Sequence, residues 1–155
     1  MTRVVFLLVQ GLHLLDLAGP AQVFAGAADL GYDYRISYVG EHATIRTAQG
    51  LTVNAEPSLP TLTDADLIVV PGWRAQPGLG DTGPLTPETL AWLRAHHAAG
   101  GTVSSVCAGT DALGRAGLLD GRRCTTHHDL QDELARRYPK ANVVRDVLYV
   151  VDGRV

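Results

Sequence analysis

Short, almost uninterrupted apolar segments alternate with stretches of helical periodicity along the whole chain of 155 residues. Residues 3–9 (RVVFLLV) and 66–71 (DLIVVP) have the composition of strands that are buried on both faces. Strands of this kind occur almost only in sheets whose two faces are covered by helices. The alternation therefore predicts an α/β fold with a mostly parallel sheet and helices on both sides.

Periodicity, capping residues and turn residues predict the remaining elements. We expect strands over 34–39 and 102–106, one or two more within 142–151, and a hairpin over 44–55. We expect helices over 14–30, from the Thr86-Pro87-Glu88 start to the Gly100-Gly101 stop, over 108–118, and through Leu130, Leu134 and Tyr138. Gly19-Pro20 should interrupt the first helix, whose expected core positions are Leu14, Leu17, Val23 and Ala27.

Composition excludes several classes of protein. A hydrophobic fraction of 46% and a charged fraction of 19% exclude disorder. Thirteen basic against 16 acidic residues, with no basic run longer than two, leave no nucleic-acid-binding surface to expect. No apolar run approaches the ~20 residues of a membrane span, and two cysteines are too few for a disulfide framework. We therefore expect one cytoplasmic domain with reduced thiols and no membrane partner.

The end of the chain has an unusual pattern. Asp152-Gly153 is a strong hairpin signal, but only Arg154 and Val155 follow it. Two residues make a poor return strand. We therefore expect residues 1–155 to be a single domain that lacks its C-terminal strand and helix.

The segment 100–121 contains the most reactive residue type of the chain, Cys107. A β-branched strand runs into Cys107 and the small residues Ala108 and Gly109, and a helix follows, which is the layout of a nucleophile elbow. The helix N-terminus should lower the pKa of the thiol, and the N–H of Ala108 with a neighbouring N–H should hold an oxyanion. A buried structural cysteine fits the same residues about equally well.

Two polar residues elsewhere bear on this choice. Asp16 stands in an otherwise apolar run (LLDLAGP) and either caps a helix start or points into a site at the strand edge. His127 follows the segment 124–126 and is either structural or the partner of Cys107 in a Cys–His pair. The residues alone leave both alternatives open in each case.

Four segments together resemble one family. They are LLDLAGPAQVF (14–24), DADLIVVPGW (64–73), SVCAGTDALGRAGLLDGRRCTTHH (105–128) and RYPKANVVRDVLYVVDGRV (137–155). The chain resembles the ThiJ/PfpI superfamily of class I glutamine amidotransferase-like domains. Within it, the chain is most similar to the N-terminal domain of AraC-type transcription regulators, followed by the stand-alone isonitrile hydratases. The resemblance implies a flavodoxin-like three-layer sandwich with a nucleophile elbow.

The resemblance also implies roles for individual residues. Cys107 takes the position of the nucleophile, and Asp16 that of the acid that hydrogen-bonds the cysteine sulfur. His127 matches the histidine of the TTH motif of the family. Gly72 and Ala108 offer backbone N–H groups to the same pocket.

Gly109 completes the elbow. Three positions depart from the family pattern. Ala108 stands where the hydratases carry a threonine whose hydroxyl helps the chemistry, and this disfavours the hydratase function. Trp73 replaces a second glycine of many members and forms an apolar wall of the pocket. His128 replaces a tryptophan that is frequent in the regulators and hydratases.

Two patterns are typical of cofactor or metal sites but lack the necessary context. Residues 78–83 match G-x-G-x-x-G, but Pro77 and Pro84 bracket them and no strand directly precedes them. This loop is expected to be a mobile flap beside Cys107 or a plain surface connection. The pairs at 96–97 and 127–128 show no spaced ligand set, and adjacent histidines on a helix point apart. We therefore expect no cofactor and no metal, and we expect Cys124 to pack as a small apolar residue.

Three functions remain. The first is the small-molecule-sensing domain of an AraC-type transcription regulator, a homodimer that reaches DNA only through a segment absent from this chain. The second is a cysteine-dependent enzyme of the isonitrile hydratase type. The third is a protein-interaction domain with an inert cysteine. We favour the first, and the identity of the ligand does not follow from the sequence.

Overall fold

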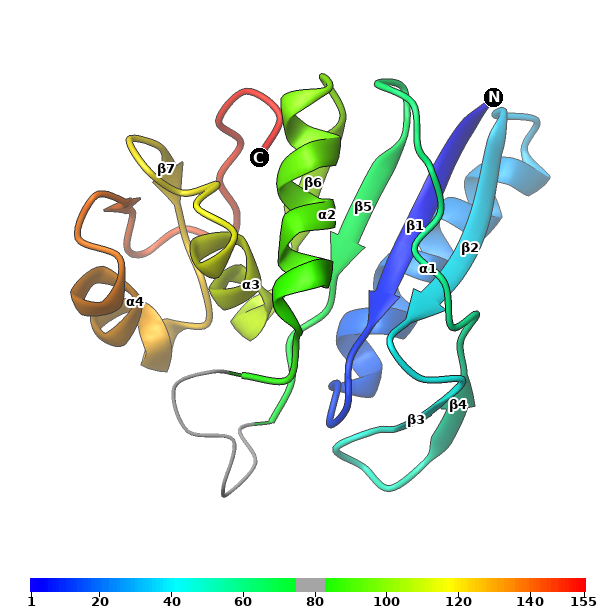
Figure 1. Cartoon of the computed structure of the whole chain (residues 1–155), viewed down its shortest axis with the longest axis horizontal. Coiled ribbons are helices and arrows are strands. Elements are labelled where there is room, and N and C mark those ends of the chain that lie inside the picture. Colours follow the sequence, from blue (N-terminus) through cyan, green and yellow to red (C-terminus); the bar gives the residue numbers. More distant parts are fainter. Residues whose placement is uncertain (75–82) are drawn as a thin grey trace.

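The computed structural model describes residues 1–74 and 83–155, and its centre is a parallel sheet of four strands. The strands are β1 (Thr2–Leu8), β2 (Tyr34–Gly40), β5 (Leu67–Val70) and β6 (Thr102–Ser105), in the spatial order β2-β1-β5-β6 (Figure 1). The chain leaves β1 towards β2 and then crosses to the other side of β1 for β5 and β6. In doubly wound α/β folds, ligands bind at the carboxyl ends of the strands beside such a reversal.

Helices cover both faces of this sheet. α1 (Leu14–Asp29) connects β1 to β2, and α2 (Pro87–Ala98) connects β5 to β6. Right-handed crossovers that run in opposite directions place their helices on opposite faces. Figure 1 shows α1 behind the sheet and α2 in front of it. The predicted flavodoxin-like arrangement, with a parallel sheet between helical layers, is confirmed.

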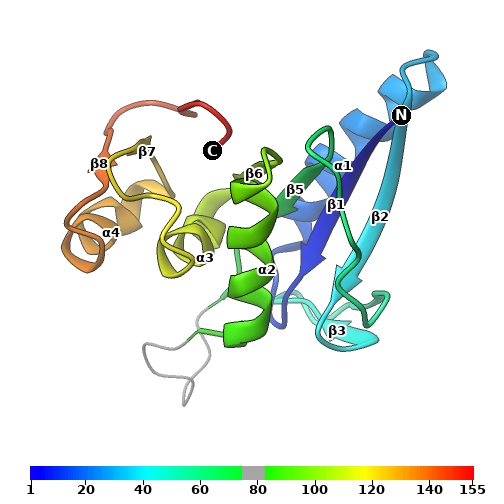
Figure 2. The same ribbon diagram turned by 45° about the horizontal axis from the view of Figure 1, so that its top comes forward.

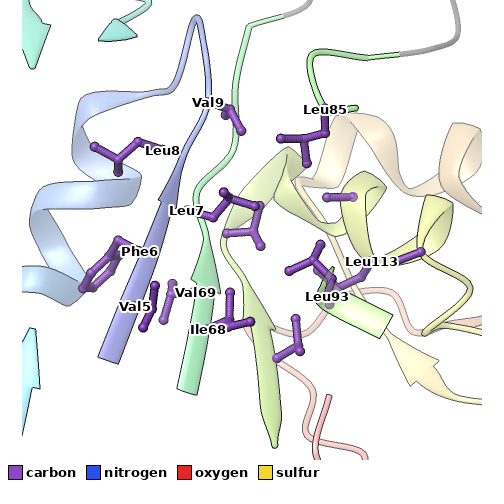
Figure 3. Close-up of a cluster of buried hydrophobic side chains, with 14 of the residues drawn as sticks. Val5, Phe6, Leu7, Leu8, Val9, Ile68, Val69, Leu85, Leu93 and Leu113 are labelled. Atoms are coloured by element: carbon purple, nitrogen blue, oxygen red, sulfur yellow. The ribbon is translucent and has the colours of Figure 1, made fainter. Parts of the chain in front are cut away.

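β1 is the centre of the hydrophobic core. Val5, Phe6 and Leu7 have no exposed surface. Because side chains alternate along a strand, Phe6 and Leu8 lie towards α1 and Leu7 lies on the other side of the sheet, as Figure 3 shows. The prediction of a strand buried on both faces at residues 3–9 is confirmed, with β1 beginning and ending one residue earlier.

α1 runs through Pro20 without a break, so the predicted interruption at this residue is wrong. Proline lacks the N–H that would bond to the carbonyl of Asp16, four residues earlier. The helix continues because Leu17 and Ala21, on either side of the proline, are buried against the sheet. Tertiary packing here outweighs the loss of one helical hydrogen bond.

The outer face of α1 is apolar. Leu15 and Val23 are 79% and 70% exposed, and the exposed positions between them carry no charge. A methyl group placed on Gly19 or Gly26 would contact nothing within 4 Å. The prediction of a core position is therefore wrong for Val23, whereas it is confirmed for Leu17, which is buried.

The predicted start of α2 is confirmed. The Oγ1 atom of Thr86 accepts a hydrogen bond from the N–H of Thr89, and Pro87 is the first helical residue. Glu41, directly after β2, ties this cap to the sheet, because its carboxylate accepts from the N–H and the Oγ1 of Thr86 at 2.7 Å each and from the Oγ1 of Thr89.

Two small strand pairs flank the main sheet. The hairpin predicted over 44–55 is confirmed, with β3 (Thr44–Arg46) antiparallel to β4 (Thr52–Asn54). β7 (Arg123–Cys124) pairs in parallel with β8 (Asn142–Val143). The prediction of one or two strands over 142–151 is confirmed by β8 alone, and residues 144–151 have no regular structure. Leu148 in that segment is fully exposed, so no described element covers it.

The remaining helices belong to the half of the chain after β6. They are the 3-10 helices η2 (Cys107–Gly109) and η3 (His128–Leu130) and the α-helices α3 (Thr110–Arg115) and α4 (Gln131–Arg137). The helix predicted over 108–118 is thus divided into η2 and a short α3, and the helix predicted before Pro139 is confirmed as α4. Figure 2 shows α4, β7 and β8 beyond α3, on the β6 side of the sheet. None of the helices in the described part of the chain has the length and apolar character needed to cross a membrane.

The last residues form a tight turn beside the outer edge of β6. Asp152 and Val155 exchange two backbone hydrogen bonds, N–H to O, of 3.0 and 3.2 Å. The N–H of Val103 in β6 donates to the carbonyl of Arg154 at 3.0 Å. The predicted turn at Asp152-Gly153 is therefore present, with Gly153 at a φ of 65°.

Candidate functional site

Cys107 lies at the carboxyl end of β6, where the strand passes into η2. Its φ is 55°, in the left-handed region that a residue with a side chain seldom adopts. Two residues later the turn requires Gly109, because a Cβ at that position would collide with the carbonyl oxygen of Val70 in β5. A strained backbone at a strand–helix junction is a common feature of functional sites. The expected strand–turn–helix layout around Cys107 is present, and its catalytic role remains a prediction.

Three segments of the chain converge in front of Gly72, directly after β5. A Cβ on Gly72 would lie 2.7 Å from Oδ2 of Asp16, 2.9 Å from the backbone N of Ala108 and 3.1 Å from Cβ of Cys107. These residues come from α1 and from the turn after β6. The structure thus brings together four of the residues that the sequence singled out, and only glycine fits among them.

Asp16 points into this site and does not cap α1. It lies in the first turn of the helix, whose N-cap residue, His13, makes no side-chain capping bond. Oδ2 of Asp16 is buried and has no conventional N–H or O–H donor within residues 1–74 and 83–155. The Asp16 carboxylate lies close enough to the Cys107 thiol to raise the pKa of that thiol. Of the two alternatives that the sequence left open for Asp16, the structure selects the site.

The thiol of Cys107 holds its proton more tightly than an ordinary cysteine does. Burial raises the pKa of the Cys107 thiol most, and the charge of Asp16 and its hydrogen bond to the thiol raise it further. The N–H of Ala108 donates to the sulfur and lowers this pKa, but it does not compensate. The prediction of a lowered pKa is therefore wrong. The helical segments after Cys107, η2 and α3, span three and six residues, too few to outweigh a neighbouring carboxylate.

Two threonines that the sequence did not single out hold the backbone of the turn. Oγ1 of Thr126 donates to the carbonyl of Cys107 at 2.8 Å, and Oγ1 of Thr110 donates to the same carbonyl at 3.1 Å. Thr110 also lies 3.0 Å from Oγ of Ser105, at the end of β6. Thr126 belongs to the TTH motif, and this motif is the sequence signal that could have identified Thr126 as a residue of the site.

His127 makes no hydrogen bond to Cys107 in the described structure. Its Nδ1 accepts from the backbone N–H of Asp129 at 3.3 Å, and its side chain is 40% exposed. Both His127 and Cys107 nevertheless line one cavity of about 760 Å³ between β6, β7 and residues 146–151. The structure therefore places His127 near the site but does not show the Cys–His pair.

A second cavity of about 360 Å³ lies on the other side of the turn. Its lining includes Ala108, Trp73 and Thr126, together with charged residues of α4. Trp73 is half-buried and pairs with Leu12 in an isolated antiparallel bridge. The expected position of Trp73 as a pocket wall agrees with this lining. The G-x-G-x-x-G segment, 78–83, and the flap expected there lie outside the described residues except for its last glycine.

An ion-pair network at the second cavity joins α4 to α3. The Arg137 guanidinium donates to Asp111 Oδ1 at 2.9 Å and to Glu133 at 2.7 Å, which confirms the predicted pair on α4 and extends it to α3. The hydroxyl of Tyr138 donates to the same carboxylate oxygen at 2.7 Å. Burial raises the pKa of Tyr138, and its hydrogen bond to Asp111 raises it further. Cys124 is buried without a partner thiol, as expected.

Cys107 has a positive φ and lies beside a carboxylate, at the carboxyl edge of a doubly wound parallel sheet. The chain is therefore an α/β protein with a cysteine at a strand–helix turn. The family model described as the DJ-1/PfpI family matches residues 2–155. The chain belongs to this family.

Relatives in the family have different functions. An uncharacterised protein from the cpoL 5′ region of Streptomyces lividans is 42% identical over 138 residues, which are 88% of this chain and 95% of that protein. Isonitrile hydratase of Pseudomonas putida is 36% identical over 147 residues, which are 91% of this chain and 60% of the hydratase. The HTH-type transcriptional regulator CdhR of Pseudomonas aeruginosa is 30% identical over 152 residues, which are 96% of this chain and 43% of the regulator.

A solved structure supports the fold. The AraC family transcriptional regulator from Pseudomonas putida superimposes with a TM-score of 0.79 at 24% identity, over 96% of this chain and 80% of that one. The chain therefore has the fold of this AraC family regulator. Its sequence is also similar to that of isonitrile hydratase. Because the relatives include both an enzyme and a regulator, the properties of the Cys107 site have to indicate which of the two functions this chain has.

Proposed function

We propose that this chain is the small-molecule-sensing domain of an AraC-type transcription regulator, and that its ligand binds at the turn that carries Cys107. The likeness to CdhR and to the fold of the Pseudomonas putida regulator supports this proposal. The proposal includes a cytoplasmic location and DNA contact through a segment outside residues 1–155.

The observation that carries the proposal is the environment of the Cys107 sulfur. Burial raises the pKa of the Cys107 thiol, and the neighbouring Asp16 carboxylate raises it further. A nucleophilic cysteine acts as the thiolate, and its environment normally lowers the pKa. Ala108, the next residue, offers a methyl group and an N–H but no hydroxyl that could carry a proton. This site favours reversible binding over turnover.

The second candidate function is an enzyme of the isonitrile hydratase type, which the 36% identity to the Pseudomonas putida hydratase favours. In this case Asp16 accepts the thiol proton while the sulfur attacks the electrophilic carbon of the substrate. The N–H groups of Ala108 and Gly72 then stabilise the developing charge; the Gly72 N–H has no hydrogen bond within the described residues. Asp16 delivers this proton to the isonitrile carbon, which gives an S-linked thioimidate. Water then adds to that carbon, and the adduct expels the Cys107 thiol and leaves the N-formamide.

The dimer that the sensing function requires is proposed to form through the outer face of α1. Leu15 and Val23 are exposed there, and the exposed positions between them carry no charge. Gly19 has no side chain, which allows another helix to approach closely. Leu15→Glu should shift the protein towards the monomer in sedimentation velocity, whereas Leu148→Glu, at a fully exposed position outside α1, should not. Equal sedimentation of the wild type and the Leu15 variant at all concentrations would contradict this dimer.

The experiment that tests the function uses a simple alkyl isonitrile with the purified protein, and it follows both N-formamide formation and thermal stability. No turnover, together with a rise in Tm that Cys107→Ser or Trp73→Ala removes, supports the sensing function. Multiple turnovers that Cys107→Ser abolishes would overturn it in favour of the enzyme. Reading the coding sequence past the codon for Val155 adds an independent test, because a sensing domain should be followed by helix-turn-helix patterns.

A further inference from the structure

We propose that His127, His128 and Asp129 bind a divalent transition metal of the Zn²⁺ class on the rim of the larger cavity. One ligand atom from each of the three residues lies within 4.8 Å of the other two. The inference stands on this geometry and is independent of the sensing function proposed above.

The two imidazoles face the same way because the backbone changes direction between them. His127 precedes η3 with φ −50° and ψ 136°, and His128 is the first residue of η3. The rings therefore stack, with centroids 4.3 Å apart and planes 30° from parallel. The expectation that adjacent histidines point apart holds for residues on a helix, and it is wrong for this pair.

Asp129 completes the ligand set. Its Oδ1 lies 3.3 Å from Nε2 of His128, and its Oδ2 lies 3.8 Å from Nδ1 of His127. Ligands of a tetrahedral zinc ion at bond lengths of about 2.0–2.1 Å lie roughly 3.3–3.4 Å apart. The His128–Asp129 separation already matches this value, whereas the His127–Asp129 separation is larger, so side-chain rotation has to bring the three ligand atoms together around the ion.

The hydrogen bond at His127 keeps one nitrogen ready for a metal. Nδ1 of His127 accepts from the N–H of Asp129, so this nitrogen carries no proton. The bond is long, at 3.3 Å, and a metal on Nδ1 would replace it. Two imidazole nitrogens and a carboxylate oxygen form the donor set of open zinc sites, in which water fills the remaining position.

The location connects this site with the cysteine. His127 and His128 line the same cavity of about 760 Å³ as Cys107. A metal on its rim would offer an open coordination position to an anionic or carbonyl-bearing ligand in that cavity. The site would thereby add a positive charge to the cavity that Cys107 also lines.

The chain contains a matched control. His96 and His97 are also adjacent histidines, but both lie on α2. His96 is buried, and its Nε2 lies 3.1 Å from the carbonyl of Asp66. This pair has the same dipeptide sequence without a convergent third ligand in the described structure.

The test is a titration of tag-free protein with Co²⁺ alone, in a Cys107→Ser/Cys124→Ser background that removes thiolate ligands. We expect visible d–d absorption that saturates at about one equivalent and is displaced by Zn²⁺. Asp129→Asn and His128→Gln should each weaken the affinity at least about tenfold, whereas His97→Gln should leave it unchanged.

Two results would overturn the proposal. One is the absence of Co²⁺ binding in the double serine background, which would assign any binding of the wild type to the thiols. The other is an equal loss of affinity in His97→Gln and His128→Gln, which would show that binding does not depend on the cluster at 127–129.

Discussion

Replacement of Gly72 by alanine tests whether α1, the end of β5 and the Cys107 turn meet as described. The added methyl group would lie 2.7 Å from Oδ2 of Asp16 and 2.9 Å from the N of Ala108, both below the 3.0 Å that real Cβ contacts respect. One of these neighbours belongs to the backbone of a strained turn, so it cannot move freely. An inserted methyl group in a well-packed site costs about 1–3 kcal/mol. For a chain of this length, each kcal/mol lowers Tm by about 2–4 °C, so we expect a fall of roughly 2–12 °C.

Urea unfolding measures this loss as a lower midpoint at an unchanged slope. Gly26→Ala is the matched control, because its methyl group contacts nothing within 4 Å and it should stabilise the helix by about 0.4–1 kcal/mol. Asp16→Ala removes the 2.7 Å contact, so the Gly72→Ala/Asp16→Ala double variant should lose less than the sum of the single losses. Wild-type stability of Gly72→Ala, or strict additivity in the double variant, would refute the convergence of these segments.

Three further predictions follow from named interactions. Asp16→Asn should lower the pKa of the Cys107 thiol, because the substitution removes a neighbouring negative charge. Thiolate absorbance against pH in a Cys124→Ala background measures this pKa. A larger effect of His127→Gln on the pKa would instead favour the Cys–His pair. Burial opposes a low pKa at Asp66, but hydrogen bonds from Thr63 and Arg3 hold the pKa of this carboxyl below its ordinary value. The contribution of Asp66 to stability is therefore present above the unfolded-state pKa, and it is lost as the pH falls through the folded-state pKa. Asp66→Asn should therefore flatten the loss of urea stability between about pH 5 and pH 2, and an unchanged pH profile would contradict this account. Thr86→Ala should cost about 1 kcal/mol, since it removes the cap of α2 and one of the donors to Glu41, and a urea midpoint equal to that of the wild type would contradict it.

The sequence predicted the sheet well because the signals for its strands are local. Residues 3–9 and 66–71 are apolar throughout, and the capping sequence at Thr86 fixed the start of α2. Predictions failed where tertiary packing decides. Leu17 and Ala21 hold α1 together across Pro20, and no local signal shows that Val23 points to solvent.

The site was predictable in its members but not in its electrostatics. The motifs placed Cys107, Asp16 and Gly72 in one pocket, and the structure brings them together. The pKa of the thiol could not be predicted, because it depends on burial and on the approach of a carboxylate from a helix about 90 residues away in the chain. The stacking of His127 on His128 depends on a single extended residue before η3, which no periodicity reveals.

Leu15 and Asp16 are neighbours in the first turn of α1, yet the first is 79% exposed and the second reaches the thiol. A single turn of helix therefore has one side in the site and the other in solvent. A molecule that binds the outer side of α1 would therefore contact the same helical turn from which the Asp16 carboxylate extends towards Cys107.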